Sequence, residues 1–106
     1  MFDADYFLSG LPMQVIAHHN AAHVRIVTDD HDYLVRDVAR TYAGAVMVNV
    51  WVDANGLAPI VPTSSNLHEF EVLPPAEHQA VTIPFDHIVE VVVVPARQAF
   101  GRFSFL

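Results

Sequence analysis

The sequence AVMVNVWV, residues 45–52, decides the fold class of this chain of 106 residues. Val occupies every second position from 46 to 52, and the intervening positions carry Ala, Met, Asn and Trp. β-Branched and aromatic residues with a period of two are typical of a β-strand. Because both faces of this strand are largely apolar, we expect residues 45–52 to lie in the centre of a sheet.

Short segments rich in Val, Ile, Tyr and Phe lie on both sides of this strand, separated by clusters of Asp, Asn, Gly and Pro. Such segments predict short strands that are joined by turns. The further strands that we expect are residues 13–17, 23–28, 33–38, 67–73, 80–83 and 88–94. With 45–52 they make seven short strands, which favour a barrel or a sandwich.

Two Asp-containing stretches predict turns. DDHD at residues 29–32 predicts a hairpin between the second and third strands, and DANG at residues 53–56 predicts a second turn. Pro59 and Pro62 have no amide hydrogen for a ladder, so residues 57–66 predict a loop or a broken edge strand. A loop of this length in a small domain is a candidate functional or interface element.

The two ends of the chain carry different signals. Residues 1–10 predict one short helix, because Asp3 can cap its start and Gly10 its end. In the tail, residues 95–106, the last eight positions (99–106) alternate aromatic side chains with small or charged ones. We expect them to form a last strand of the domain's own sheet, or a strand added to the sheet of a neighbouring subunit.

Composition and charge limit the class of protein. Hydrophobic residues make up 53% of the chain and charged residues 16%, which indicates one folded domain, residues 1–106, with its barrel at 13–94. Twelve acidic and five basic residues give a net charge of −7, which disfavours nucleic-acid binding. The chain has no cysteine, no apolar stretch of transmembrane length and no basic secretory leader, so we expect a cytoplasmic protein.

Residues 83–91, IPFDHIVEV, resemble a known family motif. Counted from residue 83 as position 0, apolar residues lie at positions 0, 5 and 8 around a tight turn. This spacing resembles the second sequence motif of the Sm-like family, which includes the bacterial Hfq-type proteins. The predicted hairpin of residues 23–38, followed by the strand at 45–52, is similar to the first motif. The resemblance implies a strongly bent, five-stranded β-barrel of the Sm or SH3-like kind, a preceding helix and a one-turn 3₁₀ connection before the last strand.

The resemblance also implies a ring of identical subunits, made by pairing the edge strand of one barrel with that of the next. Pro84 and Phe85 replace the Arg-Gly of the family signature, so the RNA-contact positions differ in type. We therefore expect a non-catalytic, homo-oligomeric scaffold or binding module whose partner is the chain itself. An RNA-binding regulator of the Sm-like kind is the first alternative.

Several polar and aromatic residues are candidates for binding. Trp51, Tyr33, Tyr42 and Phe85 could stack on bases, with arginines near them in sequence, although such aromatic residues more often lie in a core. Arg36 and Arg40 can instead pair with Asp37 and other acids. The candidate binding residues are Arg36, Arg40, Asp53, Asn55, Phe85 and His87.

Histidine spacing gives a second alternative, a small metal-dependent enzyme. His19 and His23 are four residues apart, a zinc-binding spacing on a helix, but the flanking segments predict strands and a turn. Asp86, His87 and Glu90 could supply an acid–base pair, yet adjacent residues of a strand point to opposite faces. We therefore expect no catalytic residues, no metal ligands and no cofactor.

Overall fold

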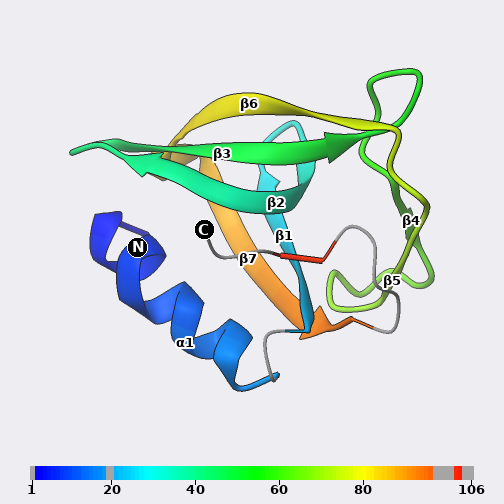
Figure 1. Ribbon diagram of the computed structural model, residues 1–106, viewed down its shortest axis with the longest axis horizontal. Coiled ribbons are helices and arrows are strands. Elements are labelled where there is room, and N and C mark those ends of the chain that lie inside the picture. Colours follow the sequence, from blue (N-terminus) through cyan, green and yellow to red (C-terminus); the bar gives the residue numbers. More distant parts are fainter. Residues whose placement is uncertain (1, 19–20, 97–101, 104–106) are drawn as a thin grey trace.

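The computed structural model describes residues 2–18, 21–96 and 102–103, and it is mainly β (Figure 1). A five-stranded sheet has the strand order β6-β3-β2-β1-β7, and a two-stranded sheet pairs β4 with β5. All of the strand pairs are antiparallel. The strands are β1 (Ala22–Thr28), β2 (Asp32–Thr41), β3 (Ala45–Val52), β4 (Ile60–Pro62), β5 (Phe70–Val72), β6 (Glu77–Pro84) and β7 (Ile88–Pro95).

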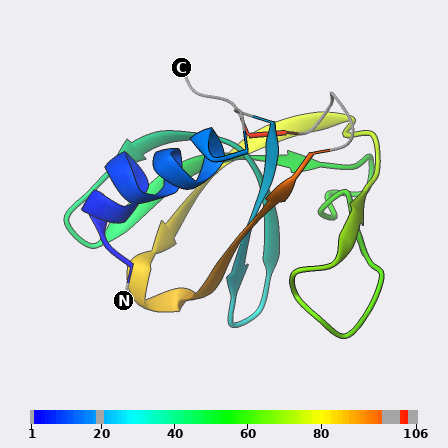
Figure 2. The same ribbon diagram turned by 90° about the horizontal axis from the view of Figure 1, so that it is seen from below.

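A helical segment precedes the sheet, formed by the π-helical turn η1 (Tyr6–Gly10) and the helix α1 (Leu11–Ile16). Phe7, Leu11 and Val15 are buried at a spacing of four residues, and they belong to the same core cluster as the valines of the sheet. Side chains four apart lie on one helical face. This face therefore packs the helix onto the sheet, while the β4–β5 hairpin lies at the opposite end (Figure 1, Figure 2).

The structure corrects two expectations at this end of the chain. The strand expected at residues 13–17 is wrong, because residues 13–16 continue the helix and Ala17 caps its end. Gly10 does not end the helix; its φ of −64° and ψ of −50° are right-handed helical values. Pro12 lies in the first turn of α1, directly after the π-helical turn η1. The expected cap at Asp3 is present, since its Oδ1 accepts the Tyr6 N–H at 2.9 Å.

The apolar side of β3 forms the middle of the core. Val46, Val48, Val50 and Val52 are buried and alternate with half-buried neighbours. The strand lies between β2 and β6, so the expectation of a central strand at Ala45–Val52 is confirmed.

The sheet bends because β2 pairs with both β1 and β3 and contains two irregularities. Its register with β3 shifts between Val35 and Asp37 and again between Val38 and Arg40. Each shift is a β-bulge, which kinks a strand and increases its twist. β3 and β6 consequently run across the steeper β1 and β7 (Figure 1). In the described residues β6 and β7 remain the two edges of an open sheet, so closure into a barrel stays a prediction.

Residues 53–76 form an insertion between β3 and β6, here called the β4–β5 insertion. Val52 and Glu77 are register partners, so the insertion leaves and re-enters the sheet at neighbouring points. Its strands β4 and β5 pair with each other.

Several strand bounds differ from those expected. β2 and β6 extend beyond residues 33–38 and 80–83. The strand expected at 67–73 is limited to β5, because Asn66 starts a turn in which its Oδ1 accepts the His68 N–H at 2.9 Å. Residues 57–66, expected as a loop or a broken edge strand, contain the short strand β4.

The C-terminal segment contributes one described anchor to the fold. Phe103 is buried in the core cluster, and its N–H donates to the Ala22 carbonyl at 2.8 Å. The rest of the predicted tail strand, residues 97–101 and 104–106, lies outside the described residues. Among the described residues, no helix has the length and apolar character needed to cross a membrane.

Candidate functional site

The two arginines predicted for binding lie on β2 and already have partners. Arg36 Nη1 donates to Asp37 Oδ2 at 2.7 Å, and its Cζ lies 5.5 Å from the Trp51 ring centroid. The expected pairing of Arg36 with Asp37 is therefore confirmed. Arg40 Cζ lies 6.0 Å from the ring centroid of Tyr42. Both guanidinium groups thus take part in cation–π contacts within the chain.

The remaining predicted binding residues lie on other elements. Asp53 Oδ1 accepts the N–H groups of Asn55 at 2.8 Å and Leu57 at 2.9 Å, so Asp53 holds the turn that begins the β4–β5 insertion. Phe85 is buried and stacks on Phe7 with centroids 5.8 Å apart, so its ring belongs to the core. His87 is exposed at the end of the 3₁₀ turn η2 (Phe85–His87).

Of the two acids considered beside His87, Asp86 and Glu90, the second is engaged elsewhere. Glu90 Oε1 lies 3.0 Å from His68 Nε2, which ties the β4–β5 insertion to β7. His19 lies outside the described residues. Within the part of the chain that the structure describes, no three His, Cys, Asp or Glu side chains gather in a group that could hold a metal ion.

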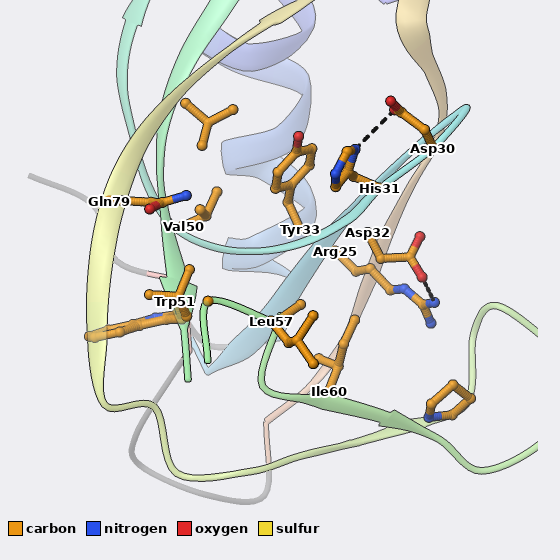
Figure 3. A pocket seen from close by; sticks show the side chains of 15 residues that line it. Arg25, Asp30, His31, Asp32, Tyr33, Val50, Trp51, Leu57, Ile60 and Gln79 are labelled. Atoms are coloured by element: carbon orange, nitrogen blue, oxygen red, sulfur yellow. Dashed lines mark hydrogen bonds and ion pairs between the residues drawn. The ribbon is translucent and has the colours of Figure 1, made fainter. Parts of the chain in front are cut away.

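A groove of about 510 Å³ lies where the β4–β5 insertion passes the ends of β2, β3 and β6 (Figure 3). Its volume is in the range of small-ligand sites. The apolar part of the lining includes Val50, Trp51, Val52, Leu57, Ile60 and Val81. The polar part includes Arg25, Asp30, His31, Asp32, Tyr33 and Gln79. An apolar lining with a few convergent polar groups is typical of a binding site.

Arg25 connects the sheet to the β4–β5 insertion at one side of the groove. Its side chain is 4% exposed, and Nη2 pairs with Asp32 Oδ2. Nη1 donates to the Leu67 carbonyl at 3.3 Å, and Cζ lies 5.3 Å from the ring centroid of Phe70. The buried guanidinium is thereby neutralised and held by both hairpins.

The β1–β2 turn supplies the exposed rim of the groove. The His31 ring stacks on Tyr33 with centroids 5.7 Å apart, and His31 Nδ1 lies 3.1 Å from Asp30 Oδ1. The hydrogen bond from His31 lowers the pKa of Asp30 below its usual value. Burial, together with the nearby Asp30 carboxylate, raises the pKa of Tyr33. The rim therefore carries a carboxylate next to an aromatic stack.

Thr28 holds this rim in place. Its Oγ1 accepts the His31 N–H at 3.1 Å and donates to the His31 carbonyl at 2.9 Å, while the Thr28 N–H donates to the same carbonyl at 2.8 Å. The turn that the DDHD sequence predicts is present, and the hydroxyl of Thr28 stabilises it.

Two side-chain N–H groups of residues that line the groove lack a hydrogen-bond partner among the described residues, although neither nitrogen reaches the surface. Arg25 Nε and Trp51 Nε1 are buried and make no hydrogen bond within the described residues. Both side chains line the groove. They lie on one face of the sheet, because Arg25 and Trp51 are each the register partner of Leu34 on β2. Figure 3 shows Leu57 and Ile60 between Trp51 and the Arg25–Asp32 pair.

The sequence did not identify this groove. Tyr33 and Trp51 are two of the four aromatic residues considered above for base stacking, but their convergence with Arg25 depends on strand register and on the path of the β4–β5 insertion. The one local signal is the Arg25–Asp32 pair, which flanks a predicted hairpin turn. Comparison of the chain with family models, curated proteins and solved structures finds no match.

Proposed function

We propose that this chain is a non-catalytic, self-assembling binding module, in which the β6 edge of one copy pairs with the β7 edge of the next. The observation that carries the proposal is that both edges of the sheet are strands of eight residues. Long edge strands invite pairing with another chain unless charges, prolines or cover protect them. A cytoplasmic location is part of the same proposal.

The register identifies the groups that β6 presents at its edge. The Phe85 N–H donates to the Gly44 carbonyl at 3.0 Å, at the end of the β3–β6 register. Hydrogen-bonded and non-bonded pairs alternate in an antiparallel ladder. The odd-numbered residues of β6 therefore bond to β3, and His78, Ala80 and Thr82 direct their N–H and C=O groups outward.

The same reasoning applies to β7. The Ala96 N–H donates to the Ala21 carbonyl at 2.9 Å, in line with the β1–β7 register, so Val91 and Val93 direct their backbone groups outward. The strand has the sequence IVEVVVVP, in which one residue is charged. An edge so rich in valine favours burial against a second strand.

The arrangement of elements supports the Sm-like resemblance. A helix precedes a bent, five-stranded antiparallel sheet, and the 3₁₀ turn η2 (Phe85–His87) joins the last two strands of that sheet. These are the elements that the resemblance implies. In this proposal the β6–β7 contacts close a ring of identical copies, and each sheet has the strong bend of an Sm-like barrel.

The charges favour a scaffold over the RNA-binding alternative. Arg25 and Arg36 form ion pairs, and Arg40 lies over Tyr42. With a net charge of −7, the chain lacks the excess of basic residues that supplies most of the affinity for phosphate backbones.

Native mass spectrometry over a range of protein concentrations tests the proposal. We expect a closed oligomer of identical subunits. Ala80→Pro removes an outward N–H of β6 and is expected to give folded monomers. The matched variant Gln79→Pro removes an N–H that bonds to β3, so it is expected to lower the unfolding temperature instead.

Two results would overturn the proposal. The first is a wild-type protein that stays monomeric at every concentration. The second is an Ala80→Pro variant that is folded, by circular dichroism, and assembles as the wild type does, since assembly would then not use the β6 edge.

A further inference from the structure

We infer that the outer face of the N-terminal helical segment packs against the same face of a second copy of this chain, as an antiparallel pair of helices. This contact uses a different surface from the β6 and β7 edges, and it does not depend on their pairing. Three properties of the segment support it: its exposed apolar side chains, its lack of charge and the position of its acidic end.

The outer face of the segment carries large apolar side chains. Leu8 is 63% exposed, Met13 70% and Ile16 58%. Leu8 and Ile16 share a row with Pro12, because side chains four residues apart lie on one helical face. Among the described elements, the sheet lies on one side of the segment and none lies on the other (Figure 1, Figure 2). A helix that is apolar all round is typically buried all round, which indicates a partner for the outer face.

No polar group on this face needs water. Residues 6–17 contain no Asp, Glu, Lys, Arg or His. The one hydroxyl on the outer face, that of Ser9, is already used, since its Oγ donates to the Asp5 carbonyl at 2.9 Å. Burial of a polar group costs little when its hydrogen bond is made within the protein. The face can therefore be covered by an apolar surface without leaving a side-chain donor unpaired.

Charge identifies a second copy as the partner. The chain has a net charge of −7, so two copies approach each other most easily at a surface that carries no charge. A strongly charged partner would be matched by opposite charges on the docking face, and this face has none. Helices that lie on membranes typically carry Lys and Arg on their polar side, whereas the chain has no Lys and its first Arg is Arg25.

The acidic start of the segment determines the orientation of the pair. Asp5 is exposed one turn before Leu8, and residues 6–28 contain no further acid. A parallel pair would bring the Asp5 side chains of both copies together. An antiparallel pair instead places each Asp5 beside the other end of the partner helix, which carries His18, and it packs Leu8 of one copy next to Ile16 of the other. Two equal contacts result, as a two-fold axis requires.

The size of the contact predicts its strength. The two helical stretches together comprise residues 6–16 and are about 16 Å long, so the pair buries less than the roughly 800 Å² per partner of a standard interface. We therefore expect single copies to associate weakly, and an Ala80→Pro variant to stay monomeric in dilute solution. An oligomer that displays several such helices associates more tightly, because the contacts act together.

Introduced thiols test the contact, because the chain has no cysteine of its own. Leu8→Cys and Ile16→Cys proteins are mixed at high micromolar concentration under air, and disulfide-linked dimers are followed by non-reducing gel electrophoresis. We expect the mixture to link at least tenfold faster than either variant alone. In the antiparallel pair, two positions 8 are about 12 Å apart along the axis, too far for a disulfide, whereas positions 8 and 16 are neighbours.

Matched controls lie on the same helix and elsewhere on the surface. Gln14 is exposed but lies on the flank of the segment, so a mixture of Leu8→Cys and Gln14→Cys is expected to link no faster than the single variants. Adding Met13→Ser to both proteins of the Leu8→Cys and Ile16→Cys mixture is expected to slow linking at least fivefold. Adding Leu73→Ser, at an exposed leucine outside the helix, leaves the rate unchanged.

The inference is overturned if the Leu8→Cys and Ile16→Cys mixture links no faster than the single variants, or if the Gln14→Cys mixture links equally fast. Fastest linking by Leu8→Cys alone would indicate a parallel pair and would also overturn it. So would phosphatidylcholine vesicles that bind the chain and suppress linking, because lipid would then be the partner.

The Ala80→Pro variant separates this inference from pairing of the sheet edges. Rapid linking of positions 8 and 16 in folded Ala80→Pro supports a helix contact that does not need the β6 edge. A wild-type oligomer whose helices do not link contradicts the helix contact alone. Linking in a chain that forms no larger oligomer at any concentration contradicts edge pairing alone.

Discussion

Asn49 Nδ2 donates to Asp37 Oδ1 at 2.7 Å across the β2–β3 pair, and the Asp37 side chain is 1% exposed. The second oxygen of this carboxylate accepts from Arg36 Nη1. The register of β2 shifts between Val35 and Asp37, and this shift brings Asp37 opposite Asn49. A buried carboxylate is tolerated here because both of its oxygens are hydrogen-bonded.

Replacing Asn49 tests the value of this contact. Asn49→Ala leaves one buried oxygen of Asp37 without its donor, so we expect the free energy of unfolding to fall by about 1–3 kcal/mol. Urea unfolding followed by circular dichroism measures the change. Asn55→Ala, at an exposed turn position, is the control and is expected to change stability by less than about 0.5 kcal/mol. Equal effects of the two substitutions would contradict the account.

The N-terminal helix offers a matched pair of leucines. Leu11 is fully buried, so Leu11→Ala is expected to cost about 2–5 kcal/mol. Leu8 lies on the same helical segment but is 63% exposed, so Leu8→Ala is expected to change stability by less than about 0.5 kcal/mol. Thermal and urea unfolding measure both. A small cost for Leu11→Ala would show that the helix does not pack on the sheet as described.

Substitutions at Gly44 and Gly56 separate two effects on stability: the backbone conformation, and the space available for a side chain. A Cβ at Gly56 or at Gly44 would meet no atom within 4 Å, but Gly56 has a φ of +81°. We expect Gly56→Ala to destabilise the protein by about 1–2 kcal/mol. Gly44→Ala is expected to be neutral or to stabilise by about 0.4–1 kcal/mol. Differential scanning calorimetry of the two variants checks the sign, and a stabilising Gly56→Ala would refute the assigned turn.

The lowered pKa of Asp30, at the rim of the groove, predicts that the stability of the fold depends on pH. The His31 hydrogen bond lowers the pKa of Asp30 below 3.8, so the folded chain holds this proton less tightly than the unfolded chain. Asp30 therefore contributes stability above about pH 3.8, and the contribution is lost as the pH falls through the lower pKa of the folded state. NMR titration of the Asp30 carboxyl carbon should show a midpoint below 3.8 that rises in His31→Ala. An unchanged midpoint in this variant would contradict the claim that His31 lowers the pKa of Asp30.

The strands could be predicted from sequence where apolar residues follow a period of two. Ala45–Val52 has the expected bounds, and β1 and β7 differ from the expected strands by one residue at an end. The N-terminal helix was underestimated, because Gly10 and Pro12 interrupt the sequence and conceal the spacing of Phe7, Leu11 and Val15. Gly10 and Pro12 are local signals for a helix end, but burial of the apolar face that contains Phe7, Leu11 and Val15 stabilises a longer helix.

The groove could not be predicted, for a different reason. Its rim comes from one turn, which the sequence indicates, but Trp51 lines the groove because of the β2–β3 register and Leu57 because of the path of the β4–β5 insertion. The burial of Arg25 likewise depends on Leu67 and Phe70, which follow it by more than forty positions. Strand spacing and turn residues carry no information about such pairings.

The β4–β5 insertion begins and ends beside the register pair Val52–Glu77, and the Ala76 N–H donates to the Val52 carbonyl at 3.2 Å. A two-residue turn could therefore replace residues 53–76 without removing a ladder bond of the five-stranded sheet. The shortened chain would leave Arg25 without the carbonyl of Leu67. The insertion can thus change in length and sequence while the five-stranded sheet keeps its hydrogen bonds, whereas the β1–β2 turn and the strand residues that line the groove would stay as they are.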